Sequence, residues 1–387
     1  MSEVKKDVAI LYHDDFDGIV SAAIYKTHMS PETFNRVLLK PMSYLSKNSL
    51  DKTVEEIKKA GFDTVVVLDF PYSALVDVWY DHHMHSKSIR EAYAVRLKFS
   101  SILGKFDFRA KSCARIVYED VVTINNPNNE RLNEIVKLAD MYDSADFKTP
   151  DYTFSEKSVM NQCYAYLENT HYSTRPAICN FMVEAFCAYI ENRISSLDMV
   201  IPVSNDDVEH LSRRAYKTRR EMVVFGDVSI TQCRLGEHPR YAEFVKIKDR
   251  KPVKYSCRIE KYPFGRNLKI SIGYNKWQGE PNMVNLGQLI RTSKYAKGGG
   301  HFDVGGGMVS PESLESFLDE MTSILSGYNI DFSEKEDCED MEKYGVDIEN
   351  DDFEKSAAEL SKEASISIDE ARKKVAEKSN NEKTSDK

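Results

Sequence analysis

Short apolar runs that stop at polar clusters recur in the first part of the chain. Three occur in order: Val8–Tyr12 before His13, Thr64–Leu68 before Asp69, and Val78–Tyr80 before Asp81. Continuous apolar runs of this length are typical of strands that are buried on both faces of a parallel sheet. Because α/β sheets carry their sites at the carboxyl ends of such strands, these polar clusters mark a candidate site.

Helical spacing marks most of the segments between and after these strands. The predicted helices are Ile19–Met29, Lys52–Ala60, Ala110–Val122, Glu130–Tyr142, Pro176–Ser196, Asn205–Met222, Val284–Lys294 and Pro311–Leu325. Alternating β-type residues occupy Val223–Ile272. This order predicts an α/β fold with a mostly parallel sheet flanked by helices, followed by a smaller α/β domain. We place the first domain at residues 1–200, the second at 201–330 and an acidic tail at 331–387.

The net charge of the chain is concentrated in that tail. The sequence holds 53 Lys and Arg residues against 62 Asp and Glu residues, a formal charge of −9. Residues 331–387 hold 19 acids and 10 bases, so residues 1–330 are neutral. A segment of this composition is expected to be disordered. A neutral body excludes a basic coat protein that binds long nucleic acids through a large excess of positive charge.

Neither export nor membrane insertion is indicated. No apolar run is long enough to span a bilayer, and Met1–Asp7 leads directly into an apolar strand. The seven cysteines are scattered, and none forms a Cys-x-x-Cys pair. We therefore expect a cytoplasmic protein with reduced thiols, no membrane partner and no cysteine zinc site.

Carboxylates and imidazoles dominate the polar clusters. The candidates are His13, Asp15, Asp17, Asp69, Asp81, His82, His83 and the acidic group Asp140, Asp143 and Asp146. His13, Asp15 and Asp17 alternate, so they can converge from one side of an extended strand end. This mixture of donors suits Mn²⁺ or Mg²⁺ and would also accept Fe²⁺, Co²⁺ or Zn²⁺. The donors exceed the needs of one ion, which favours two ions that share a bridging carboxylate.

In this order, the motifs resemble the DHH phosphoesterase family with its associated DHHA1 domain. The similarity spans roughly residues 8–310 and rests on His13-x-Asp15-x-Asp17-Gly18, the strand before Asp69, Asp81-His82-His83, and Gly298-Gly-Gly-His301. Ser112-Cys-Ala114 and Leu138–Asp143 agree with it as well. The resemblance implies a DHH domain followed by a DHHA1-like domain.

The resemblance also implies a role for each matched residue of the first domain. His13 and Asp15 would bind a first metal ion and Asp17 a second, with Asp69 as the bridge. One of His82 and His83 would complete the second site while the other contacts phosphate. Asp143 would be the last ligand, and Asp81 would orient an imidazole.

In the second domain, the resemblance assigns the substrate to a glycine-rich segment. Gly298, Gly299 and Gly300 would let the backbone approach the substrate closely, and His301 would bind a phosphate or sugar. Arg291 and Lys297, just before this segment, are candidates for phosphate contact. The family typically continues with small residues, whereas Phe302-Asp303-Val304 follow here, a departure that bears on substrate preference.

Structural alternatives stay open for several of these residues. Asp69 could belong to a turn or cap a helix, and Asp140 or Asp146 could take the place of Asp143. The glycines could form a flexible linker. For the basic helix that contains Arg213, Arg214, Arg219 and Arg220, we favour a solvated face over nucleic-acid binding.

The function predicted from the sequence is metal-dependent hydrolysis of short single-stranded RNA or DNA, with two Mn²⁺ ions, or Mg²⁺ or Co²⁺ in their place. A neutral body favours short substrates, since it can neutralise few phosphates. Alternatives are a phosphatase of bisphosphorylated adenosine, a cyclic-dinucleotide phosphodiesterase and an inorganic pyrophosphatase. An alternative from another class is a catalytically quiet nucleotide-binding or sensing module. A homodimer is left open.

Overall fold

The computed structural model describes residues 5–29, 34–43, 49–83, 103–122, 129–155, 167, 174–197, 205–234, 239–248, 250–261 and 266–327. The chain divides into two compact units, Met1–Arg213 and Arg214–Lys387, and each is described by itself. The domain boundary after residue 200 stays a prediction. The predicted acidic tail lies outside the described residues.

A five-stranded parallel sheet forms the centre of the first unit. Its strands are β1 (Lys6–His13), β2 (Phe34–Met42), β3 (Thr64–Leu68), β4 (Val78–Asp81) and β5 (Leu103–Phe106), in the order β2-β1-β3-β4-β5. The chain moves from β1 outward to β2 and then returns to the other side of β1. The carboxyl ends of strands at such a switch point leave a crevice in which α/β proteins place their sites.

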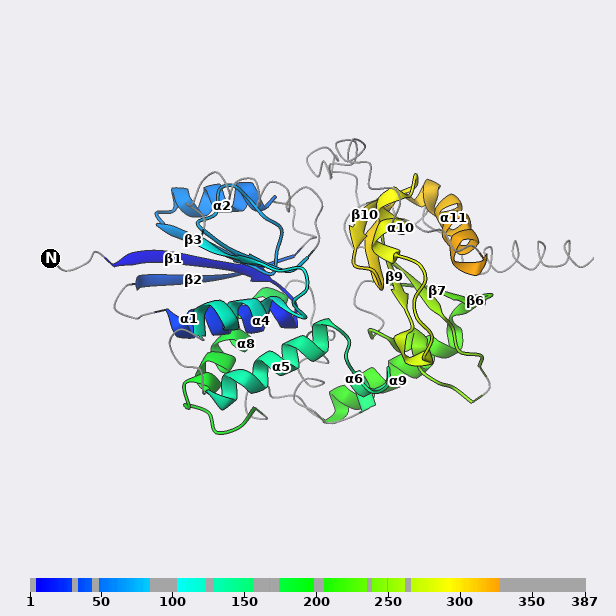
Figure 1. The fold of residues 1–387 in the computed structure, drawn as a ribbon, viewed down its shortest axis with the longest axis horizontal. Coiled ribbons are helices and arrows are strands. Elements are labelled where there is room, and N and C mark those ends of the chain that lie inside the picture. Colours follow the sequence, from blue (N-terminus) through cyan, green and yellow to red (C-terminus); the bar gives the residue numbers. More distant parts are fainter. Residues whose placement is uncertain are drawn as a thin grey trace, which may run out of the picture. The chain divides into compact units, whose positions relative to one another are not determined.

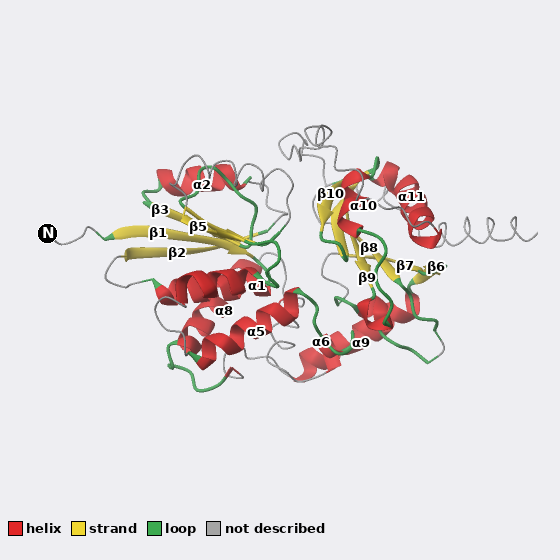
Figure 2. Cartoon of the chain, viewed as in Figure 1, coloured by secondary structure: helices red, strands yellow, loops and turns green. Residues whose placement is uncertain are grey.

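Helices cover both faces of this sheet (Figure 1). On one face lies α2 (Leu50–Lys59), and on the other lie α1 (Phe16–His28), α4 (Cys113–Val117), α5 (Glu130–Asp143) and α8 (Arg175–Ile190). Figure 2 shows the strands enclosed between these helical layers. Ala9 and Leu11 of β1 pack in one cluster with Val54 and Ile57 of α2, while the intervening Ile10 is equally buried. Burial on both faces explains why the strands are apolar without alternation.

Most predicted elements of the first unit are confirmed, and the differences have local causes. β2 is absent from the predicted elements because it lacks the continuous buried apolar run of β1, β3 and β4. Its Pro41 is tolerated since β2 is an edge strand. β5 was also missed and has only four residues. The predicted helix Ala110–Val122 begins at Cys113 and changes to a π-helical turn at Tyr118–Val122. The helix predicted to reach Ser196 ends at Ile190, and Asn192 adopts a left-handed φ of 61°.

A six-stranded mixed sheet organises the second unit, in the order β10-β11-β9-β8-β7-β6. The strands are β6 (Val223–Phe225), β7 (Val228–Arg234), β8 (Tyr255–Lys261), β9 (Leu268–Tyr274), β10 (Ala296–Gly300) and β11 (Val304–Val309). Strands β7 and β8 are parallel, and the other neighbours are antiparallel. Helices α10 (Leu286–Thr292) and α11 (Leu314–Gly327) supply apolar residues to its core, and α9 (Asn205–Glu221) precedes the sheet. The predicted fold class is confirmed.

The glycine-rich segment is a β-hairpin. Gly298, Gly299 and Gly300 of β10 pair with the three glycines of β11. A Cβ atom at Gly298 would lie 2.1 Å from the carbonyl oxygen of Gly306, and one at Gly300 would lie 2.3 Å from that of Val304. The close approach of the hairpin's own strands therefore requires glycine at these positions, and the linker alternative is wrong.

Among the described residues, no helix combines the length and the apolar character needed to cross a membrane. The five cysteines in this part of the chain, Cys113, Cys179, Cys187, Cys233 and Cys257, are all buried.

Candidate metal centre

The polar clusters of the first unit meet at the carboxyl ends of β1, β3 and β4. Within the described residues, three groups of potential metal ligands form, and in each group the ligand atoms lie within 4.8 Å of one another. The groups are His13/Asp15/Asp69, Asp69/His82/His83 and Asp17/His82/Asp143. All seven metal ligands predicted from the sequence are therefore brought together, although they come from segments up to 130 residues apart.

Asp69 lies at the middle of this arrangement. Its side chain is buried and belongs to two of the three groups. The nearest ring nitrogens of His13, His82 and His83 lie 3.4–3.6 Å from its side-chain oxygens. Within the described residues, none of these contacts to the carboxylate has the geometry of a hydrogen bond. Its backbone has a left-handed φ of 56° and begins no helix, so the helix-cap alternative is wrong. A buried carboxylate is costly unless positive charge lies beside it; here that charge can come from the imidazoles of His13 and His83, whose pKa values Asp69 helps to raise, or from a bound cation.

His82 offers one ring nitrogen to the carboxylates. Its Nδ1 lies 3.2 Å from the carbonyl oxygen of Ala110, a partner that assigns the proton to Nδ1. Its Nε2 lies 3.2 Å from Asp143 and 3.6 Å from Asp17. Burial lowers the pKa of His82, and the neighbouring His83 acts in the same direction. The result is a neutral imidazole, which is the form that binds metal ions.

His83 is held by Asp81. One carboxylate oxygen of Asp81 accepts hydrogen bonds from the backbone N–H groups of His82 and His83, at 2.8 and 3.1 Å, and lies 2.9 Å from Nδ1 of His83. Burial opposes the charged form of His83, but Asp81 and then Asp69 raise its pKa to about 10. This geometry is the one that an orienting role for Asp81 requires.

Asp17 is fixed by the first turn of α4. Its two oxygens accept hydrogen bonds from the backbone N–H groups of Cys113 and Ala114, at 2.7 and 2.9 Å. These are amides that an isolated helix leaves unpaired. Burial raises the pKa of Asp17 to about 7, and the charge of Asp143 adds to the effect. Ser112, the first residue of the Ser112-Cys-Ala114 motif, is the N-cap of α4, so this motif places the two amides against Asp17.

His13 and Asp15 form the pair at the end of β1. Nδ1 of His13 lies 3.0 Å from Asp15, whose other oxygen accepts a hydrogen bond from Gly18 N and caps α1. Burial would lower the pKa of His13, but Asp15 and Asp69 raise it well above its usual value. A Cβ atom at Gly18 would lie 2.2 Å from the carbonyl oxygen of His13, which explains the glycine in this motif.

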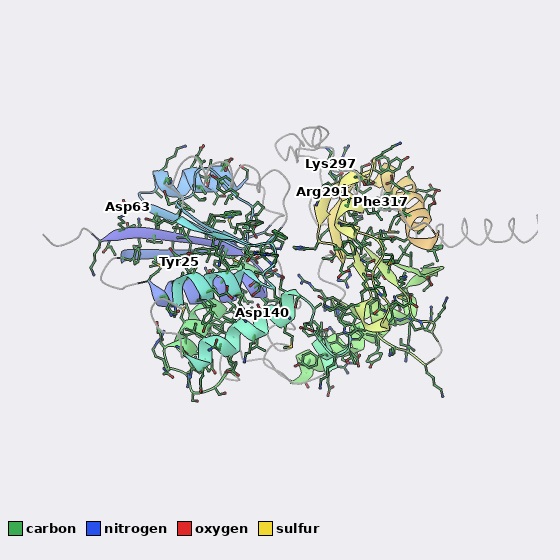
Figure 3. All side chains as sticks on the ribbon, in the orientation of Figure 1. Tyr25, Asp63, Asp140, Arg291, Lys297 and Phe317 are labelled. Atoms are coloured by element: carbon green, nitrogen blue, oxygen red, sulfur yellow. The ribbon has the colours of Figure 1, made fainter. Side chains whose placement is uncertain are left out.

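The acidic residues at the end of α5 and just beyond it, Asp140, Asp143 and Asp146, have three different roles. Asp143 is the member that faces Asp17 and His82. Asp140 instead accepts hydrogen bonds from Ser112 and Arg115 (it is labelled in Figure 3), and Asp146 forms an exposed ion pair with Lys111. Within the described residues, neither Asp140 nor Asp146 takes the place of Asp143.

The donor set fits divalent cations. Four carboxylates and three imidazoles supply oxygen and nitrogen ligands of the kind found around Mg²⁺, Mn²⁺ and related ions. Burial, Asp17 and Asp15 raise the pKa of Asp69 well above its usual value, and a bound cation would reverse this effect. The residues can thus hold divalent metal, while the choice of Mn²⁺ stays a prediction.

The predicted substrate residues of the second unit lie around the glycine hairpin (Figure 3). Arg291 is half-buried in α10, and its Nε lies 3.7 Å from the position that a Cβ atom would take at Gly299. The carbonyl oxygens of His301 and Phe302 accept hydrogen bonds from Gly287 and Leu286, at 2.9 and 2.8 Å. The turn after the glycines is therefore fixed, with the Phe302 side chain 51% exposed.

One arginine of the basic helix α9 is buried, although the sequence predicts a solvated face for this helix. Arg219 is fully buried, and its guanidinium donates hydrogen bonds to the carbonyl oxygens of Val245 and Lys251. It joins the helix to the following segment, while Lys217 and Arg220 are exposed. The solvated face predicted for this helix is therefore wrong for Arg219. Sequence reasoning also missed Arg175, which contacts the loop after β1 and gave no motif signal.

Comparisons with known proteins gave matches among solved structures. No family model matches the chain, and no curated protein does. The pGpG-specific phosphodiesterase PggH from Vibrio cholerae is 17% identical, with 82% of this chain and 98% of that chain covered and a TM-score of 0.45. The DHH domain of a protein described as a member of a ribosomal protein family is 11% identical, with coverages of 84% and 88% and a TM-score of 0.45.

RecJ from Thermus thermophilus, in complex with Mn²⁺, is also similar. It is 11% identical, with 84% of this chain and 52% of that chain covered and a TM-score of 0.45.

Proposed function

We propose that the chain is a divalent-metal-dependent phosphoesterase that hydrolyses phosphodiester bonds of short single-stranded RNA or DNA. The observation that carries the proposal is Asp69, a buried carboxylate that belongs to two adjacent groups of potential ligands. A carboxylate in this position could join two ions, and two-metal sites stabilise the attacking and leaving oxygens in phosphatases and nucleases. We propose Mn²⁺ as the cofactor, with Mg²⁺ or Co²⁺ as replacements.

The chain's own residues would hold and orient the reacting groups. His13, Asp15, Asp17, Asp69, His82 and Asp143 would hold two divalent ions, with Asp69 as the bridge. When bound, such ions lower the pKa of water and stabilise the charge that develops on phosphate oxygens. His83, positioned by Asp81, would donate a hydrogen bond to the scissile phosphate. The hydrogen bond from His82 to Ala110 fixes the ring so that Nε2 faces the ligands.

Two features support a short nucleotide substrate. Residues 1–330 are neutral overall, so little long-range attraction for a long polyanion is present. In the second unit, the side chains of Arg291 and His301 are of the kinds that bind a phosphate or a sugar. Because Gly299 has no side chain, the face of β10 next to Arg291 is left open.

The test is hydrolysis of di- to pentanucleotides by the purified chain with Mn²⁺. Asp69→Ala should abolish turnover, since the shared ligand is lost. Asp146→Asn is the matched control, because Asp146 belongs to the same acidic segment but forms an exposed ion pair with Lys111. Full activity of Asp69→Ala would refute the proposal.

The same assay separates the alternatives. Faster hydrolysis of pyrophosphate, bisphosphorylated adenosine or a cyclic dinucleotide than of linear dinucleotides would reassign the substrate. Nucleotide binding without product release over hours, with metal bound, would indicate a quiet binding module.

A further inference from the structure

Arg175 joins α8 to the loop that carries His13 and Asp15. Its Nη2 donates a hydrogen bond of 2.9 Å to the carbonyl oxygen of Asp14, and its Nε lies 3.3 Å from the same oxygen. Nε also lies 3.2 Å from the carboxylate of Asp14. Its Nη1 donates a hydrogen bond of 3.1 Å to the carbonyl oxygen of Leu167. One guanidinium thus binds both the backbone and the side chain of a single loop residue.

Asp14 is the residue between two of the proposed ligands. Consecutive Cα atoms are about 3.8 Å apart, so displacement of the Asp14 backbone moves both His13 and Asp15. The other side of this residue is already held, because Asp14 N donates to the carbonyl oxygen of Met42 at 2.9 Å. The preceding Tyr12 donates from its hydroxyl to Asn180 of α8, at 2.6 Å. Helix α8 therefore fixes the end of β1 at two points close together along the strand.

The charge of Asp14 also needs a partner. Its carboxylate lies 3.8 Å from Nε2 of His13, on the side of the ring opposite to the Nδ1 atom that faces Asp15 and Asp69. The ion pair with Arg175 holds the carboxylate. Arg175 begins α8 and is followed by Pro176, whose fixed φ suits the first turn of a helix, so the side chain starts from a preset backbone.

We infer that Arg175 is a positioning residue for the metal centre, which holds His13 and Asp15 in their ligand geometry through Asp14. This inference rests on the proposed function, because it assumes that these residues bind a divalent ion. It assigns to α8 a part in the site that no motif of the sequence marks.

Arg131 provides a matched control within the same unit. Its guanidinium also binds backbone carbonyls, those of Tyr189, Ile194 and Ser195, and it stacks on the ring of Tyr189. It lies at the start of α5, twelve residues before Asp143, or about 18 Å along the helix. Replacing Arg131 by Lys removes a similar fork of hydrogen bonds without touching the loop after β1.

The experiment measures Mn²⁺ affinity by calorimetry on the whole metal-free chain, together with the melting temperature, for wild type, Arg175→Lys and Arg131→Lys. Lysine keeps the positive charge, so a change in Mn²⁺ affinity reports the loss of the guanidinium hydrogen bonds rather than the loss of charge. We expect Arg175→Lys to weaken Mn²⁺ binding about tenfold, the size seen when a group behind a ligand is removed. Arg131→Lys should lower the melting temperature and leave Mn²⁺ affinity unchanged.

The two proposals fail in different ways. Unchanged Mn²⁺ affinity in Arg175→Lys, or equal weakening in both variants, would overturn the positioning role and leave the proposed function standing. A wild-type chain that binds no divalent ion would overturn both. Where Arg175→Lys does not fold, Asn180→Ala, which releases Tyr12 from α8, replaces it in the same comparison. Unchanged affinity there would overturn the role of α8.

Discussion

Asp69 allows the proposed metal centre to be tested without an activity assay. Asp69→Asn keeps the size of the side chain, and asparagine tolerates the left-handed backbone found at this position. The substitution therefore removes the charge and little else. In the metal-free chain, Asp69 is buried beside Asp15 and Asp17, which raise its pKa. We expect the metal-free variant to melt near the wild-type temperature, because asparagine removes the repulsion from Asp15 and Asp17 together with the attraction of the neighbouring imidazoles.

The size of the metal effect follows from linkage. An ion present at 100 times its dissociation constant stabilises the folded state by about 2.7 kcal/mol. The first unit spans residues 1–213, and for a domain of this size about 1 kcal/mol changes the melting temperature by about 2–4 °C. Mn²⁺ should therefore raise the melting temperature of the wild-type unit by roughly 5–11 °C. In Asp69→Asn, this increase should nearly vanish.

Differential scanning calorimetry with and without Mn²⁺ measures both effects. Asp77→Asn is the control, since Asp77 belongs to the same unit but accepts a hydrogen bond from Val65 N and pairs with Lys58. It should lower the melting temperature and keep the Mn²⁺-induced increase. A full Mn²⁺-induced increase in Asp69→Asn would refute the bridging role, and its absence from wild type would refute the metal centre itself.

Three further predictions concern single positions. Asp143→Asn should reduce turnover at least tenfold while Asp146→Asn leaves it unchanged, and equal turnover of short oligonucleotides by both would contradict the assignment of Asp143. Gly298→Ala should destabilise the second unit by about 1–3 kcal/mol in urea unfolding, whereas Gly299→Ala, whose nearest contact is 3.7 Å away, should be tolerated. Arg219→Met should cost about 2–3 kcal/mol in the same measurement, because two buried carbonyl groups lose their donor; an unchanged midpoint would show that water replaces it.

Local patterns determined much of the fold and the kind of chemistry. The apolar runs that became β1, β3 and β4 are buried on both faces, so their composition alone marked them as strands. Each ends at a carboxylate or imidazole, and the parallel arrangement of strands then required these groups to share one edge. Oxygen and nitrogen donors in that number already pointed to divalent ions.

Other features depend on contacts between distant segments, which no local pattern encodes. The hydrogen bond from Cys113 N to Asp17 joins residues 96 positions apart, and that from Arg175 to Asp14 joins residues 161 apart. Asp143 rather than Asp140 joins the potential metal ligands because Asp140 forms an ion pair with Arg115. β2 has mostly unburied side chains and contains Pro41, so only its pairing at the edge of the sheet identifies it as a strand.

The sequence by itself thus determined which side chains could bind metal and in what order they occur. Only the tertiary structure decided which of them converge, which are neutralised by arginine, and which helix holds the loop after β1. The physical reason is that side-chain chemistry is fixed residue by residue, whereas distance, burial and pairing arise only when the chain packs.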